Sequence, residues 1–180
     1  KKTPVMDKTI SKDVVETISK YGLENNMYIE VSDGYKYYKF FPTKDHRKYD
    51  IYNKHTFSGR IKSFLGGIRY VKNIESFMDI KGHLYQIVLA GEKEQVLMAK
   101  AKIESMNFPD IEIRDFIMDG YLFINSVGMG KARGMKILCD FYNIDIKDVI
   151  AIGDEMNDID MLQEAGLGIA MGNAQEKVKE

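Results

Sequence analysis

Four carboxylates lie close together in a short segment near the C-terminus. They follow the apolar residues 149–152 and are separated from them by one glycine; the acids are Asp154, Glu155, Asp158 and Asp160. Acids this close repel one another unless a cation lies among them or water screens them. Carboxylate oxygens are the ligands that hard cations such as Mg²⁺ prefer. The segment therefore indicates either a cation site or an acidic turn that caps a helix.

The residues around the acids predict a strand that leads into a helix. Residues 149–152 form a continuous apolar run, which is typical of a strand covered on both faces in a parallel sheet. A helical pattern of apolar residues begins around Asn157. Open α/β sheets bind ligands beyond the carboxyl ends of their strands, which is where these acids stand. A calcium-binding loop does not fit, because Met156 and Leu162 fall where oxygen ligands are needed.

A second segment, residues 128–138, places a lysine at the start of another predicted helix. Ala132, Met135 and Leu138 have helical spacing, which puts Lys131 at or just before the first turn. A lysine there opposes the helix dipole at a cost of roughly 0.3–1 kcal/mol, which a nearby anion would reverse. The alternative is a lysine that extends into water. A Walker A loop is excluded because Ala132 replaces its Ser or Thr.

These two segments resemble the C-terminal motifs of the haloacid dehalogenase superfamily, in its Cof-type sugar-phosphatase branch. Residues 153–158 read Gly-Asp-Glu-Met-Asn-Asp, and a small-residue strand pattern follows, ending in Gly172-Asn173-Ala174. Lys131 falls at the position of the lysine of that branch, and Ala132 replaces the usual glycine after it. The resemblance is specific over residues 128–174.

The resemblance implies hydrolysis of a phosphate monoester through an aspartyl-phosphate. It assigns Asp154 as a Mg²⁺ ligand and Lys131 as the cation that neutralises the phosphoryl group and the nucleophile. Asp158 supports the metal shell or positions Lys131, and Asn157 hydrogen-bonds the phosphate or Lys131. The expected cofactor is Mg²⁺ and the expected partner is a small phosphorylated metabolite, such as a sugar phosphate.

The motif that holds the nucleophile in this family has no match here. It is an apolar strand followed by Asp-x-Asp-Gly-Thr, whereas the one Asp-x-Asp in this sequence, at Asp158 and Asp160, lies in a helical pattern without Gly-Thr. We therefore expect the chain to contain a cap domain and the C-terminal part of a core, and to be inactive by itself. Two alternatives are a non-catalytic module that binds a ligand or partner, and a phosphomutase.

The upstream residues predict a second, α+β unit. The fold class is thus α/β: a partial Rossmann-like core at 127–180 and an α+β cap domain at 1–126, with an antiparallel sheet and helices, whose first residues link core and cap. Residues 42–66 are polar and predicted to be helical in part. The other expected elements are helices at 11–21, 73–80 and 92–104, and strands at 27–31, 35–40, 83–89, 111–117 and 121–125.

Composition narrows the class of protein. Of the 180 residues, 44% are hydrophobic and 29% charged, which is normal for a globular protein. The net charge of −1 gives no general attraction to nucleic acid or to an acidic membrane. A single cysteine, Cys139, excludes a disulfide framework and favours a reducing compartment, so we expect a cytoplasmic protein. The oligomeric state is left open. The first residue is not methionine, which we interpret as a sign of processing or of a fragment.

Overall fold

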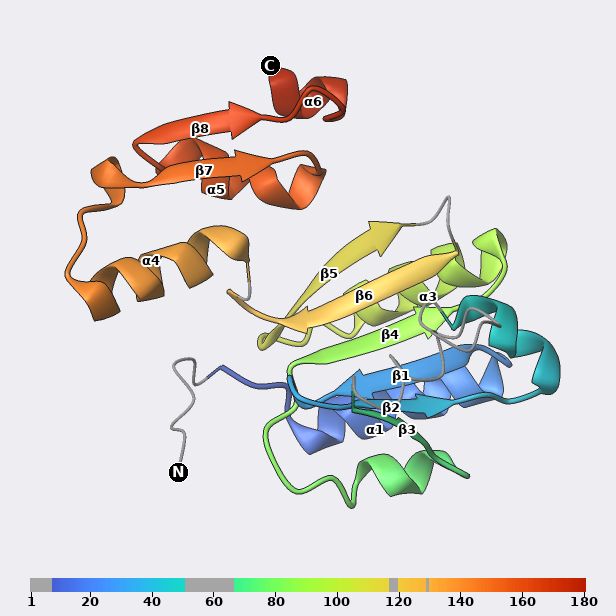
Figure 1. The fold of residues 1–180 in the computed structure, drawn as a ribbon. Coiled ribbons are helices and arrows are strands. Elements are labelled where there is room, and N and C mark those ends of the chain that lie inside the picture. Colours follow the sequence, from blue (N-terminus) through green and yellow to red (C-terminus); the bar gives the residue numbers. More distant parts are fainter. Residues whose placement is uncertain (1–7, 51–66, 117–119, 129) are drawn as a thin grey trace. The chain divides into compact units, whose positions relative to one another are not determined.

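The chain is described by a computed structural model over residues 8–50, 67–116, 120–128 and 130–180. It divides into two compact units, one of residues 8–127 and one that contains residues 128–180 (Figure 1). Each unit has its own sheet. Lys131 and the acidic turn at residues 154–158, which were singled out from the sequence, belong to the second unit.

The first unit is built on a six-stranded sheet in the order β3-β2-β1-β4-β6-β5. All neighbouring strands are antiparallel except β2 and β3, which are parallel. Its elements are α1 (Lys12–Glu24), β1 (Tyr28–Ser32), β2 (Tyr37–Phe40), η1 (Lys44–Tyr49), β3 (Ile68–Tyr70), η2 (Ile74–Phe77), β4 (Gln86–Ala90), α3 (Lys93–Ser105), β5 (Ile111–Phe116) and β6 (Tyr121–Ser126).

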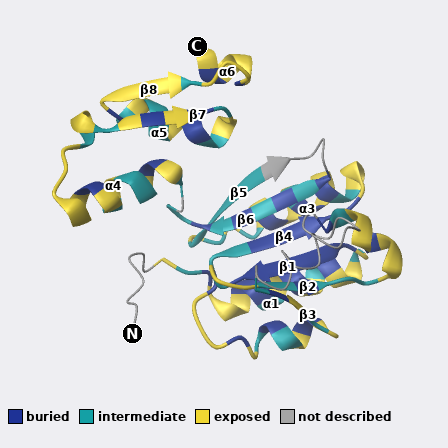
Figure 2. Ribbon diagram, viewed as in Figure 1, coloured by how far each residue is buried: buried dark blue, intermediate teal, exposed yellow. Residues whose placement is uncertain are grey.

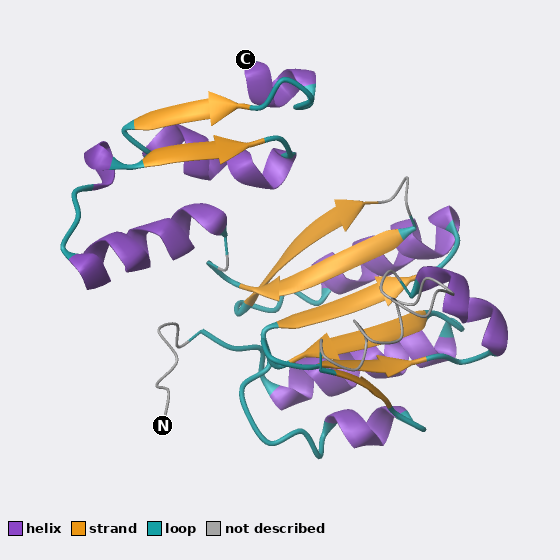
Figure 3. Ribbon diagram, viewed as in Figure 1, coloured by secondary structure: helices purple, strands orange, loops and turns teal. Residues whose placement is uncertain are grey.

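The core of this unit lies between the sheet and its two long helices. Helices α1 and α3 cover the same face of the sheet (Figure 3). Val15 and Ile18 of α1 are fully buried in one cluster with Ile29 of β1. The hydroxyl of Ser11 accepts a hydrogen bond from the Val14 N–H at 3.4 Å, which satisfies a donor at the helix start. The alternate apolar side chains of β1 thus pack against the apolar side of α1.

On the opposite face, charged side chains are buried together. Lys39 is fully buried, and its ammonium lies 2.5 Å from Asp50 and 3.1 Å from Glu30. The Tyr28 hydroxyl donates to Glu30 at 2.6 Å, and burial, followed by the Glu30 charge, raises the pKa of Tyr28 well above its usual range. Since Asp50 follows η1, this network ties that segment to the strands.

Most predicted elements of this unit are present within three residues of their expected bounds. The strand β3 was not among the expected elements. Gly67 has a φ of +73° and its carbonyl accepts a hydrogen bond from the Tyr37 N–H at 3.3 Å, so the glycine turn begins the strand. Apart from this parallel pair, the sheet is antiparallel, as expected. Of the expected helical segment, residues 51–66 lie outside the described ranges.

The second unit has a two-stranded parallel sheet connected by a helix. Its elements are α4 (Lys131–Tyr142), η4 (Ile146–Asp148), β7 (Ile150–Gly153), η5 (Met156–Asp158), α5 (Ile159–Glu164), β8 (Leu167–Ala170) and α6 (Glu176–Lys179). The connection packs closely on the strands: a Cβ added at Gly168 would lie 2.3 Å from the Leu162 carbonyl oxygen. Because the strands are parallel, their carboxyl ends meet at one edge.

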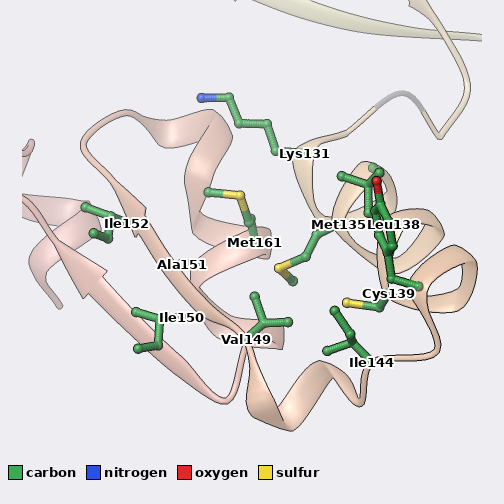
Figure 4. A pocket seen from close by; sticks show the side chains of 12 residues that line it. Lys131, Met135, Leu138, Cys139, Ile144, Val149, Ile150, Ala151, Ile152 and Met161 are labelled. Atoms are coloured by element: carbon green, nitrogen blue, oxygen red, sulfur yellow. The ribbon is translucent and has the colours of Figure 1, made fainter.

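The strand predicted at 149–152 to be covered on both faces is covered on one face only by the described residues. Ala151 is buried, whereas Ile150 and Ile152 are 62% and 59% exposed (Figure 2). A groove of about 610 Å³ separates β7 from α4, and apolar side chains such as Leu138 line it (Figure 4). A run of apolar residues shows which faces prefer burial; it does not show whether a neighbouring element covers both. Among the described helices, none combines the length and hydropathy required to cross a membrane.

Replacing Lys39 with alanine is expected to lower the free energy of unfolding by about 3–5 kcal/mol, because Asp50 and Glu30 would remain buried without their cation. The matched control is Lys48→Ala, which removes a surface pair with Glu92 (2.6 Å) and is expected to have little effect. Urea denaturation followed by circular dichroism measures both variants. Equal effects would contradict the role of the buried network.

Candidate active site

The lysine singled out from the sequence is the first residue of α4. Gly130 precedes it in an extended conformation, and the side chain of Lys131 lies at one end of the groove beside β7 (Figure 4). Its ammonium donates a hydrogen bond to Asp158 Oδ1. A lysine at the start of a helix opposes the helix dipole unless an anion lies nearby. Asp158, 27 residues further along the chain, is that anion.

Asp158 is a buried carboxylate, and both of its oxygens accept hydrogen bonds. It is 3% exposed, and its Oδ2 accepts hydrogen bonds from the backbone N–H groups of Asp154 (3.0 Å) and Glu155 (3.1 Å). Burial by itself would raise the pKa of Asp158. The Lys131 ammonium and the two N–H groups outweigh burial and hold the pKa below its ordinary value. Asp158 is therefore charged at neutral pH and directed into the protein.

Glycine is required at the end of β7 for this arrangement. A Cβ added at Gly153 would lie 2.4 Å from the Cβ and 2.7 Å from the Cγ of Asp158. Real Cβ atoms do not approach side-chain atoms so closely, so any other residue would displace Asp158. The Gly-Asp pair of the sequence motif is thus explained by the space that the second aspartate occupies.

Asp154 has a different environment from Asp158. Its side chain is partly exposed, and its Oδ2 accepts a hydrogen bond from the Asn173 side-chain amide at 3.1 Å. Within the described ranges no other group donates to this carboxylate. Asp158 therefore uses both of its carboxylate oxygens in hydrogen bonds within the fold. Asp154 keeps one oxygen, Oδ1, without a donor from the described residues.

Asn157 brings a buried acceptor to the same turn. Its Oδ1 is shielded from solvent and has no hydrogen-bond partner among the described residues, Lys131 included. Buried polar atoms of this kind are uncommon and call for an explanation, such as a bound water or ligand group. The prediction that Asn157 contacts phosphate or Lys131 is not settled by this geometry and stays a prediction.

Three of the four acids accept hydrogen bonds from other side chains. Lys131 neutralises Asp158, and side-chain amides of Asn173 and Gln175 donate to Asp154 and Glu155. The charge of Asp158 is neutralised by the Lys131 ammonium, and a cation or water among the other acids stays a prediction. No role was predicted for Asn173 or Gln175. Both follow β8, whose carboxyl end lies beside that of β7, and this position was the available signal.

The donors present fit Mg²⁺ better than a cation that needs many protein ligands. No group of three or more His, Cys, Asp or Glu side chains in the described ranges is arranged to hold a metal. Asp158 is already bonded to Lys131 and two N–H groups, so Asp154 stays the predicted ligand. Mg²⁺ commonly uses one or two carboxylates, with waters and phosphate oxygens completing its shell. One carboxylate with a free oxygen, Asp154, therefore fits Mg²⁺ whose shell is completed by waters and phosphate oxygens.

The sequence of the whole chain matches a known family. Residues 1–180 match the profile described as haloacid dehalogenase-like hydrolase. This match confirms the resemblance predicted from the Lys131 and Asp154 segments.

Individual relatives show how much of the fold is shared. The chain is 26% identical over 175 residues to 5-amino-6-(5-phospho-D-ribitylamino)uracil phosphatase YitU of Bacillus subtilis, covering 95% of this chain and 57% of that protein. The chain is 28% identical over 184 residues to YwtE of Bacillus subtilis, which has the same activity name, covering 95% of this chain and 63% of that protein. The crystal structure of a haloacid dehalogenase-like hydrolase from Bacteroides thetaiotaomicron superposes with a TM-score of 0.73 at 23% identity, over 96% of this chain and 60% of that one. This last likeness shows the fold alone.

Replacing Gly153 with alanine is expected to destabilise the second unit by about 1–3 kcal/mol, because the added methyl group displaces Asp158. Gly134→Ala is the control: the added Cβ has no atom within 4 Å and lies inside α4, where alanine is favoured by up to about 1 kcal/mol. Urea titrations followed through the NMR signals of residues 128–180 measure both changes. A Gly153→Ala protein as stable as the parent would contradict this packing.

The Lys131–Asp158 pair is expected to give the second unit a defined pH dependence. The pKa of Asp158 is lowered in the folded state, so the stabilisation is complete above the unfolded value of about 3.9 and is lost as the pH falls through the folded value. Lys131→Met should cost about 1 kcal/mol at pH 7. The same NMR-detected unfolding at pH 7, 5 and 3 should show the two proteins converging below about pH 4. A constant difference over that range would refute the pairing.

Proposed function

We propose that this chain, which belongs to the haloacid dehalogenase-like hydrolase family, contributes the phosphate-binding and Mg²⁺-binding part of a phosphatase that acts on small phosphate monoesters. The observation that carries the proposal is the meeting of three groups at one strand end. A buried Asp158 fixes the ammonium of Lys131, and Asp154 on the same turn retains a carboxylate oxygen for a cation.

Lys131 supplies the fixed positive charge. An ammonium has three N–H donors, and Asp158 takes one of them, so the others are available to the oxygens of a phosphoryl group. A donor held in place before the reaction stabilises developing negative charge without reorganising. Mg²⁺, held by Asp154, would add charge neutralisation of the transferring group. Asp158 acts by orienting Lys131.

The covalent step needs a carboxylate that this turn does not provide. In the reaction that family membership implies, an aspartate oxygen bonds to phosphorus as the alcohol leaves, and water then releases phosphate from the aspartyl-phosphate. Asp158 is buried and bonded to Lys131, so it is poorly placed to attack. Asp160 is an exposed residue of α5. We therefore propose that the chain does not hydrolyse phosphate esters by itself.

The open side of β7 supports the same view. Ile150 and Ile152 expose large apolar side chains beside the groove, and contiguous apolar surface of this kind favours a covering partner. The chain spans about 57–63% of the two curated relatives described above. We propose that a further segment, outside the region matched to those proteins, covers this face and supplies the nucleophile.

The names of the relatives suggest a substrate to test. YitU and YwtE are both named as phosphatases of 5-amino-6-(5-phospho-D-ribitylamino)uracil, a phosphorylated ribityl compound. We propose a small phosphorylated metabolite of this size as the substrate, selected by the unit of residues 8–127 acting as a cap. A cytoplasmic location stays an expectation that rests on the single cysteine.

The test is a chimera that joins the part of YitU outside the matched region to this chain. The chain alone should give no turnover of p-nitrophenyl phosphate above buffer with Mg²⁺, and the chimera should release inorganic phosphate. Lys131→Met and Asp154→Ala should each reduce the chimera's activity at least about 10²-fold, the size of losing one fixed charge-stabilising group.

Asp160→Asn is the matched control for these variants, because Asp160 is a nearby exposed acid, in the first turn of α5. It should leave the activity of the chimera nearly unchanged. Turnover by the chain alone that Asp154→Ala abolishes would show that the nucleophile lies within these residues, and would refute the proposed inactivity. Release of free phosphate, rather than its appearance on a second sugar, separates hydrolysis from a phosphomutase reaction.

A further inference from the structure

The segment after β8 returns to the acidic turn and is bonded to it along its backbone. The Met171 N–H donates to the Gly153 carbonyl at 2.9 Å, and the Gln175 N–H donates to the Asp154 carbonyl at 3.2 Å. Between them, Ala174 is buried. We call residues 171–175 the return segment. Its position relative to Asp154 is fixed by hydrogen bonds on both sides.

One side chain of the return segment reaches the proposed cation ligand. The side-chain nitrogen of Asn173 lies 3.1 Å from Asp154 Oδ2. A carboxylate only accepts hydrogen bonds, so the NH₂ end of the amide must face it. In the described part of the chain, Asn173 is the one donor to this carboxylate, whereas Asp158 has three.

We propose that Asn173 is a positioning residue that prepares Asp154 for a divalent cation. This inference rests on the proposed function. A carboxylate on a partly exposed turn can rotate, and binding a cation then requires that this freedom be lost. A hydrogen bond to Oδ2 restricts the rotation before the cation arrives and leaves Oδ1 without a donor from the described residues.

The chemical type of Asn173 suits this task. An amide is neutral, so it restrains Asp154 without cancelling the negative charge that attracts the cation. A lysine or arginine in its place would compete with the cation, as Lys131 neutralises Asp158. Carboxylates that bind metals are commonly hydrogen-bonded by such outer groups, whose loss typically weakens metal affinity 10–100-fold.

The return segment contains its own matched control. Gln175 also donates from a side-chain amide to a carboxylate of the turn, at 2.6 Å, but its partner is the exposed Glu155. If the amides merely held the return segment in place, removing either bond would have the same consequence. If Asn173 acts through Asp154, only its removal should change cation binding.

The experiment is a titration of the full chain with Mg²⁺, followed by NMR, with Mn²⁺ broadening to locate the site. Asp154→Ala should abolish binding. Asn173→Ala should weaken the affinity about tenfold, and Asn173→Gln, which keeps the amide on a longer arm, should recover part of it. Gln175→Ala should leave the affinity unchanged. Amide chemical shifts of residues 128–180 should show that each variant retains the fold.

The outcomes separate this inference from the proposed function. Absence of cation effects near Asp154 in the unaltered chain would overturn the cation site, and the role of Asn173 with it. Binding that depends on Asp154 but that Asn173→Ala does not weaken would overturn only the role of Asn173. Equal losses of Mg²⁺ affinity in Asn173→Ala and Gln175→Ala would show that the return segment contributes only structurally. That result would also overturn the role of Asn173.

Discussion

The second unit depends on the compensation of one buried charge. Asp158 lies in the interior, where an unpaired carboxylate would be strongly unfavourable. Its two oxygens accept from Lys131 and from the N–H groups of Asp154 and Glu155, so the charge links the start of α4 to the turn after β7. The same bonds fix the residues that surround the proposed phosphate site. Stability and function therefore draw on a single set of contacts.

The two aspartates of the motif illustrate how environment divides roles between identical side chains. Asp158 is buried and receives charged and backbone donors, which keeps it ionised and occupied. Asp154, four residues earlier, is partly exposed and receives one neutral amide. Asp158 therefore has little left with which to bind a cation, whereas Asp154 has an accessible oxygen. Spacing along the chain alone does not reveal this difference, because both acids lie in the same turn.

Much of the fold could be predicted because its cause is local. Alternating or continuous apolar runs and helix caps such as Ser11 determine elements through nearest neighbours, and those elements are present. The strand β3 and the exposed face of β7 could not be predicted in this way. Whether a three-residue segment pairs, or an apolar face is covered, depends on which distant residues pack against it.

The sequence by itself determined the chemical inventory of the site: a lysine that begins a helix, and a Gly-Asp turn with a second aspartate four residues on. These follow from residue types and short spacings, which a chain keeps whatever its fold. Only the tertiary structure decided the partners. It assigned Lys131 to Asp158, brought Asn173 to Asp154, and buried Lys39 between Asp50 and Glu30. Those pairings join residues up to 27 positions apart, and folding selects them because buried charges and polar groups must find partners.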